Sequence, residues 1–419
     1  MRYYIAVAVS ISVFIVPWLA LNFPEQADYI LAGMKNIGSQ LAAIVIHNPR
    51  TITQLQNKYS TETPNSVTRV RILLVPGHEP NYGGAEYGSI KERDLTVSLA
   101  NYLSGFLNEN KKYEVVTTRG ANSWNPIFSS YFKNYWDDII NWQKSYKEES
   151  LRRITTPQPS NKPKVYHNSA PDNVAYRLYG ITKWSNENNI DIAIHIHFND
   201  HPGHSQRSPG EYSGFTIYTP EAQYLNSTTT RAISETLFTR LRKYNPISDL
   251  PGESEGIVDE RELISIGANN TADAASLLIE YGYIYETQFT DPNTRELALK
   301  DLAFQTYLGL EDFFNFKGQS SLASTYDTLV LPHTWTVPIS EKSSTSQDVY
   351  ALQTALLADG LYPPGQKSKN DCPRTGKIGV CTKAALEAFQ NKHGITGEKG
   401  ITGPQTVEAL NREYGVKTI

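Results

Sequence analysis

The sequence predicts an α/β protein with a mainly parallel sheet flanked by helices, a small three-helix C-terminal domain and an N-terminal membrane helix. Three observations support this prediction. From Val70 onward, short apolar runs alternate with segments of helical periodicity, which is the pattern of a layered α/β fold. The stretch after residue 345 contains helical stripes only, and an uncharged apolar run lies close to the N-terminus.

The chain has 419 residues, which is too long for one ordinary compact domain. Hydrophobic residues make up 39% and charged residues 20% of the sequence, so a folded core is expected and a disordered chain is excluded. The 39 basic and 43 acidic residues give a net charge of −4, which argues against a nucleic-acid partner.

Residues 3–23 carry no charged side chain and are long enough to span a bilayer, which requires about 20 apolar residues. Arg2 precedes this run and the next basic residue is Lys35, so the positive-inside rule places the bulk of the chain outside the cytoplasm. The sequence around Ala20 does not resemble a small-x-small cleavage site, which favours a retained anchor over a cleaved signal peptide. Pro17 would kink a spanning helix and keeps both interpretations open. We therefore expect an envelope protein on the extracytoplasmic side, anchored to the membrane or secreted.

The next stretch contains an apolar stripe with helical spacing, made of Ile30, Met34, Ile37, Leu41 and Ile44. A helix on the membrane or packed on the body is favoured over a dimerising coil. From about residue 48 to residue 68 the sequence is polar and aperiodic, which predicts a spacer.

The elements of the sheet domain follow from periodicity. Strands are expected where short runs rich in Ile, Val and Leu occur, at 71–75, 114–118, 190–198, 214–219 and 276–284. Helices are expected where apolar residues recur every three or four positions, at 95–107, 174–189, 229–243 and 294–314.

An aromatic-rich segment between Gly120 and Pro171 interrupts this alternation and ends in a proline-rich stretch, which predicts an insertion. Its aromatic side chains either line a binding groove or form a small core of their own, and the second interpretation is favoured. A stretch rich in Ser, Thr and Pro then predicts a linker before the helical domain. The expected divisions are 1–24 anchor or signal peptide, 25–69 juxtamembrane helix and spacer, 70–316 catalytic domain with the insertion at about 120–171, 317–345 linker, and 346–416 C-terminal domain.

Titratable residues gather at the expected strand ends. Four of the nine histidines lie close together, at His195, His197, His201 and His204. His195 and His197 share one face of a strand, and ligands of open α/β sheets bind beyond the carboxyl ends of strands, where His78 also falls. Glu280 lies in an apolar strand, where an unpaired carboxylate is costly, and Glu92 opens the first helix. Two imidazoles and one carboxylate leave a fourth position open on zinc, which is the ligand set of a hydrolytic site. Spacing alone does not select these residues from the other acids and histidines.

Four motifs resemble, in order, those of zinc-dependent N-acetylmuramoyl-L-alanine amidases: Val75-Pro-Gly-His78, Lys91-Glu-Arg-Asp94, Ile194-His-Ile-His-Phe-Asn199 and Leu278-Ile-Glu-Tyr-Gly-Tyr283. The resemblance covers roughly residues 70–316. It implies one zinc ion bound by His78, Glu92 and His197, with Glu280 as the catalytic acid and base. The implied reaction is hydrolysis of the amide bond between N-acetylmuramic acid and L-alanine in peptidoglycan.

The sequence departs from the family pattern around the first motif. Val75 stands where the family usually has Asp, and Glu79-Pro80 stands in place of a glycine pair, which is displaced to Gly83-Gly84. Glu79 is therefore a rival ligand. His195 replaces a residue that is commonly small, so it either competes with His197 or braces the ligands, as Asn199 also could. In some relatives an inserted segment covers the zinc site, which is a second role to consider for the insertion.

The C-terminal domain resembles three-helix peptidoglycan-binding modules in four stretches, 348–353, 375–379, 383–390 and 400–404. The resemblance implies peptidoglycan as the partner and a role in raising the local enzyme concentration on the wall. Cys372 and Cys381 flank the glycine-containing turn before the second helix, either as a local disulfide in an oxidising compartment or as two buried thiols.

The sequence as a whole predicts an envelope-anchored zinc amidase that cleaves peptidoglycan. Two alternatives remain at this stage: a catalytically inactive peptidoglycan-binding or regulatory envelope protein, and a zinc peptidase that acts on the stem peptide.

Overall fold

The computed structural model describes residues 49–60, 69–153, 165, 170–266, 273–315, 330–336, 338–339 and 346–416. The expected membrane segment at residues 3–23 and the apolar stripe after it lie outside these ranges. Within the described ranges, no helix combines the length and apolar character needed to cross a membrane.

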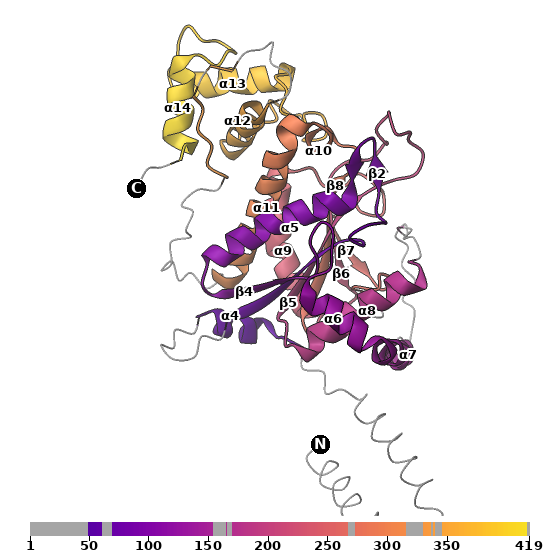
Figure 1. The fold of residues 1–419 in the computed structure, drawn as a ribbon. Helices are drawn as coiled ribbons and strands as arrows, with labels where there is room; N and C mark the ends of the chain where they lie inside the picture. The colour runs from indigo at the N-terminus through magenta and orange to yellow at the C-terminus, as the bar shows by residue number, and fades with distance from the viewer. Residues whose placement is uncertain are drawn as a thin grey trace, which may run out of the picture.

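A six-stranded sheet forms the centre of the larger part of the chain, which we call the sheet domain (Figure 1). Its strand order is β4-β1-β5-β8-β6-β7, with bounds β1 Val70–Pro76, β4 Tyr113–Thr117, β5 Ile192–Asn199, β6 Thr216–Pro220, β7 Ile257–Glu260 and β8 Ala275–Tyr283. All neighbouring strands are parallel except β6 and β8, which are antiparallel. The predicted mainly parallel sheet is confirmed.

Helices cover both faces of the sheet, which explains why the central strands are apolar on both sides. One face packs Ile72 and Leu74 of β1 against α5 Glu92–Glu109, α9 Ser227–Tyr244 and α11 Pro292–Asn315. The other face presents Leu73 and Val75 to α6 Pro126–Asn134, α7 Trp136–Arg153 and α8 Asp172–Glu187. The register of the central strands places His195 beside Val75 and His197 beside Glu280. The two histidines and the glutamate therefore lie together at one end of the sheet.

The insertion forms helices α6 and α7, whose aromatic side chains do not make a separate core. Phe128 and Phe132 are buried, and they pack with Trp184 of α8 and with Leu73 of the sheet. Trp136 is half-buried against the same cluster. The aromatic residues of this segment therefore supply the packing for one face of the sheet.

The prediction of an aperiodic spacer is wrong for residues 52–60, which form helix α4 Ile52–Ser60. Leu55 and Tyr59 are buried in the main core, and Arg50 and Lys58 both pair with Asp191, a buried carboxylate at the start of β5. This helix has only two buried residues, four positions apart, and the residues around them are mostly polar. Two positions are too few to show a helical period in the sequence.

The C-terminal domain contains three helices, α12 Gln347–Ala358, α13 Val380–Lys392 and α14 Pro404–Tyr414. Leu352, Leu386 and Leu410, one from each helix, meet in its core. Trp335 is also buried there, so part of the expected linker belongs to this domain, and its indole donates a hydrogen bond to the Asp348 carbonyl.

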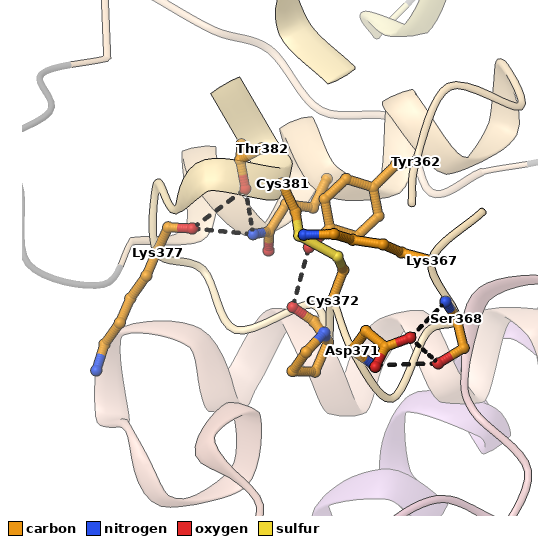
Figure 2. Close-up of a disulfide and its surroundings, with 10 residues drawn as sticks. Tyr362, Lys367, Ser368, Asp371, Cys372, Lys377, Cys381 and Thr382 are labelled. Atoms are coloured by element: carbon orange, nitrogen blue, oxygen red, sulfur yellow. Dashed lines mark hydrogen bonds between the residues drawn. A yellow bond between two sulfur atoms is a disulfide. The ribbon is translucent and has the colours of Figure 1, made fainter. Parts of the chain in front are cut away.

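A disulfide joins Cys372, in the loop before α13, to Cys381 in the first turn of that helix (Figure 2). Tyr362 lies beside it and donates a hydrogen bond to the Pro373 carbonyl at 3.1 Å. The disulfide therefore closes the turn that the two cysteines flank in the sequence.

Candidate active site

Three residues from separate elements converge at the carboxyl end of β1 and β5. His78 lies in the loop after β1, Glu92 is the first residue of α5, and His197 is near the end of β5. One ligand atom from each lies within 4.8 Å of the others. The three residues that the family resemblance implied as metal ligands are thus brought together by the fold.

His78 is held in an unusual backbone conformation. Its φ is 68°, in the left-handed region that residues other than glycine rarely adopt. Gly84 follows in the same loop with φ 83°, and a Cβ there would lie 2.9 Å from His78 Cδ2 and 3.2 Å from Glu92 Cβ. The displaced glycine pair therefore packs directly against His78, although it does not follow it in sequence.

Gly77 makes room for His197. A Cβ at Gly77 would come within 3.0 Å of three atoms of the His197 ring, closer than real Cβ atoms approach a neighbour. The Gly77 amide also donates a hydrogen bond to the Ile196 carbonyl at 2.9 Å. The imidazole of His197 can therefore pack closely against the backbone at Gly77, in the loop that carries His78.

Glu92 connects the two imidazoles. Its Oε1 lies 3.0 Å from His197 Nδ1 and accepts a hydrogen bond from the Phe198 amide at 3.1 Å. Its Oε2 lies 2.7 Å from His78 Nε2 and accepts from the Ala85 amide at 2.9 Å. Burial by itself would raise the pKa of this carboxyl, but the charges of the two histidines and the hydrogen bond with His197 lower it below its usual value. Glu92 is therefore ionised at neutral pH.

This donor set fits a divalent cation. His78 Nε2 is buried and has no hydrogen-bond partner, because its 2.7 Å contact with Glu92 lacks hydrogen-bond geometry. Buried polar atoms rarely stay unpaired in folded proteins. A buried ring nitrogen that makes no hydrogen bond, beside an ionised carboxylate and a second imidazole, is an arrangement that zinc would satisfy.

Glu280 lies next to His197 in the register between β5 and β8. Its Oε2 is buried without a hydrogen-bond partner. Burial raises the pKa of Glu280 well above its usual value, and the negative charges of Glu92 and Glu253 raise it further. A carboxyl with a raised pKa beside the ligand group suits acid and base chemistry near neutral pH.

His195 and Glu79 lie outside the ligand group. His195 is 3% exposed, and burial, assisted by His197, lowers its pKa to about 3, so it is neutral. Glu79, the rival ligand, instead lies 3.0 Å from Arg177 of α8 in a salt bridge. This contact connects the His78 loop to the helices on the neighbouring face of the sheet.

Two buried charged residues near the site, Arg119 and Glu253, are not marked by any sequence motif. Arg119 follows β4 and donates hydrogen bonds to the carbonyls of Pro76 and Gly77, and burial lowers its pKa to about 10. Glu253 accepts a hydrogen bond from Asn199 at 2.8 Å. The position of Arg119 just after a strand could have indicated a role at the sheet end, whereas Glu253 lies in a loop without a pattern.

The fold and the site together define a class of hydrolase, in which a mainly parallel α/β sheet carries histidine and carboxylate donors beside a buried acid. The family model of N-acetylmuramoyl-L-alanine amidases matches residues 72–310, more than half of the chain. The chain belongs to this family and hydrolyses the amide bond between N-acetylmuramic acid and L-alanine in peptidoglycan. A second family model, that of a peptidoglycan-binding domain, matches residues 345–410.

Solved structures of amidases are similar to the sheet domain. The CwlD amidase of Clostridioides difficile, in complex with the GerS lipoprotein, is 15% identical over 59% of this chain and 100% of its own, with a TM-score of 0.36. An N-acetylmuramyl-L-alanine amidase from Mycobacterium abscessus is 14% identical over 58% of this chain and 97% of its own, with a TM-score of 0.38. The AmiC2 amidase of Nostoc punctiforme is 14% identical over 59% and 97%, with a TM-score of 0.36. No curated protein matches the chain significantly.

Proposed function

We propose that this amidase depends on one zinc ion held by His78, Glu92 and His197, and that it acts on peptidoglycan outside the cytoplasm. The observation that carries the proposal is the convergence of these three side chains, with ligand atoms within 4.8 Å of one another. Three protein ligands would leave a further coordination position for chemistry, as in catalytic zinc sites. A bound zinc ion supplies Lewis acidity to water and to the carbonyl oxygen of the substrate.

Glu280 is the proposed acid and base. It takes a proton from the attacking water and donates it to the departing nitrogen of L-alanine. In the zinc-free protein, burial and two neighbouring carboxylates favour its protonated form. A cation at the ligand group would favour the carboxylate that a base requires.

The surrounding residues hold the proposed ligands in place. Glu92 fixes both imidazoles through its two oxygens, and Arg119 fixes the loop that carries His78 by binding the carbonyl oxygens of that loop. Asn199 is held by Glu253 at the end of the strand that carries His197. These contacts keep the ligand geometry fixed before substrate binds.

The proposed organisation follows the sequence divisions, with residues 70–316 as the catalytic domain and 346–416 as the wall-binding domain. The family match of residues 345–410 supports peptidoglycan as the ligand of the second domain. The uncharged run at residues 3–23 supports an anchor in the cytoplasmic membrane, which would keep the enzyme at the cell envelope.

The test is Glu280→Gln, which removes the titratable group and keeps the size of the side chain. We expect the hydrolysis of defined muropeptides, followed by mass spectrometry of products with an L-alanine N-terminus, to fall by about 10²–10⁴-fold. The zinc content, measured by elemental analysis, should stay at that of the wild type. Glu211→Gln, at an exposed acid in the segment between β5 and β6, is the matched control and should be fully active.

Cleavage at the wild-type rate by Glu280→Gln would refute the proposed mechanism. Full activity after chelation and removal of zinc would refute the proposed cofactor.

A further inference from the structure

We propose that the C-terminal domain is docked on the sheet domain as a fixed part of the substrate-binding surface, at the same end of the sheet as the active site. A freely tethered domain would only raise the local concentration of enzyme on the wall. The inference rests on the proposed function, because it takes peptidoglycan as the common ligand of both domains.

A buried ion pair joins the two domains. Arg374 of the C-terminal domain lies 2.7 Å from Asp301 of α11, and the two side chains are 4% and 2% exposed. The guanidinium also donates to Asn245 Oδ1, just beyond α9, and to Thr354 Oγ1 of α12, both at 2.7 Å. Both charges are buried because the two domains pack against each other, and the guanidinium is hydrogen-bonded to groups of both domains, so the contact has a defined geometry.

Aromatic side chains on both sides of the ion pair interlock the two cores. Tyr350 of α12 is buried in the core of the sheet domain, and Tyr244 of α9 is buried in the core of the C-terminal domain. The Arg374 guanidinium lies 4.7 Å from the centre of the Tyr350 ring and 5.9 Å from that of Tyr244. Each domain thus buries a large side chain of the other, and separation would expose both.

The loop that carries the disulfide adds contacts at the rim. Lys369 donates to the Arg242 carbonyl at 2.7 Å, and Asn370 donates to Asp249 Oδ2 at 3.2 Å. Asp249 Oδ1 in turn accepts from the Ser213 amide at 2.7 Å, and Ser213 lies in the segment between β5 and β6. A chain of hydrogen bonds therefore connects the C-terminal domain to the segment that follows Asn199.

The topology places this contact at the active-site end. β6 begins at Thr216, beside Glu280, and runs away from the site, so α9 returns toward the site and ends at Tyr244. α11 begins at Pro292, shortly after β8 ends at the site. Figure 1 shows α12 and α14 at the same end of the molecule as strand β2 Glu86–Tyr87, which lies in the segment between His78 and Glu92.

A docked domain fixes the distance and direction between its own ligand and the catalytic site. A polymer bound to the C-terminal domain would then present its amide bonds to the site in one orientation. A short soluble muropeptide reaches the site without the second domain. The arrangement therefore predicts that docking matters for intact peptidoglycan and not for small substrates.

Gly376 offers a test with a matched control. Its φ is 73°, and a Cβ there would lie 2.2 Å from Thr294 Cγ2 in α11, by far its closest contact, and 3.0 Å from the Ser346 carbonyl oxygen of its own domain. Gly365 has φ 68° in the same domain, and a Cβ there would meet nothing within 4 Å. Alanine at either position causes similar backbone strain, but only Gly376→Ala forces the domains apart. Thr294→Ser removes the clashing methyl group and keeps the hydroxyl, so the double variant should restore docking.

The experiment uses the full chain and compares the hydrolysis of purified sacculi with that of a soluble muramyl peptide. We expect Gly376→Ala to lower the ratio of sacculus to soluble activity by about tenfold or more. Gly365→Ala and Gly376→Ala/Thr294→Ser should keep the wild-type ratio. Asp301→Leu, which leaves Arg374 buried without its partner, is a second variant expected to lower the ratio.

An unchanged ratio in both Gly376→Ala and Asp301→Leu would overturn the docked arrangement and leave a simple tether. A fall in Gly376→Ala that Thr294→Ser does not reverse, together with an unchanged ratio in Asp301→Leu, would assign the effect to damage within the C-terminal domain and would also overturn it. Failure of the wild type to cleave the soluble peptide would instead refute the proposed function.

Discussion

Gly77→Ala is predicted to displace His197, one of the proposed zinc ligands, although His197 itself is not mutated. The backbone of Gly77 lies outside the left-handed region, so alanine causes no backbone strain there. The added methyl group would lie 2.7 Å from His197 Nδ1 and closer still to two other ring atoms, whereas ordinary contact begins at 3.4 Å. The nearest ring atom, Cε1, would lie 2.3 Å from the methyl group, so the imidazole must move by about 1.1 Å to reach ordinary contact, away from the position that Glu92 fixes.

The size of the effect follows from this displacement. Overpacking a well-packed site costs about 1–3 kcal/mol, and part of that strain is present in the zinc-free protein as well. We expect zinc affinity to fall by about 10–100-fold, which corresponds to roughly 1.4–2.8 kcal/mol. A shift of this size at a reacting centre also lowers the turnover number by about 10²-fold.

The assay is competition for zinc against a chromophoric chelator, with muropeptide hydrolysis measured in parallel at saturating zinc. Gly105→Ala is the control, because Gly105 lies inside α5 and a Cβ there meets nothing within 4 Å. It should raise the free energy of unfolding by about 0.5–1 kcal/mol and leave zinc affinity unchanged. Wild-type zinc affinity and activity in Gly77→Ala would show that His197 is not a ligand in this position.

Two further predictions concern buried charges. Arg119→Met leaves the carbonyls of Pro76 and Gly77 without their donor, so urea denaturation should show a free energy of unfolding that is lower by about 2–4 kcal/mol. Arg119→Lys should recover only part of this loss. If Arg119→Met is as stable as the wild type, Arg119 does not have this role. Burial raises the pKa of Glu311 above 4.5, despite hydrogen bonds from Tyr113 and Tyr59. The native state then binds more protons than the unfolded state above pH 4.5, so the contribution of Glu311 to the free energy of unfolding is lost as pH rises. Denaturation at pH 4 to 8 should show Glu311→Gln gaining stability relative to wild type by about 1.4 kcal/mol for each unit of pKa elevation, and a pH-independent difference would refute it.

Much of the architecture could be predicted from the sequence, because burial on a regular element leaves a period. The apolar runs of β1, β5 and β8 and the leucine repeats of α5 are local patterns that identify strands and helices covered on both sides. Helix α4 and the short strand β7 were missed, since each buries too few apolar residues to make a pattern. The aromatic insertion could be located, but whether its side chains face a groove or the sheet depends on packing across the chain.

The sequence by itself determined the order of the elements, the chemical groups available and, through its motifs, the family resemblance. Only the tertiary structure decided that His78, Glu92 and His197 lie within reach of one ion, that Glu79 pairs with Arg177 instead, and that the C-terminal domain packs on α9 and α11. The physical reason is that periodicity reports which face of an element is buried. Contacts between distant segments, and the hydrogen bonds that make a buried charge tolerable, have no period and exist only after the chain has folded.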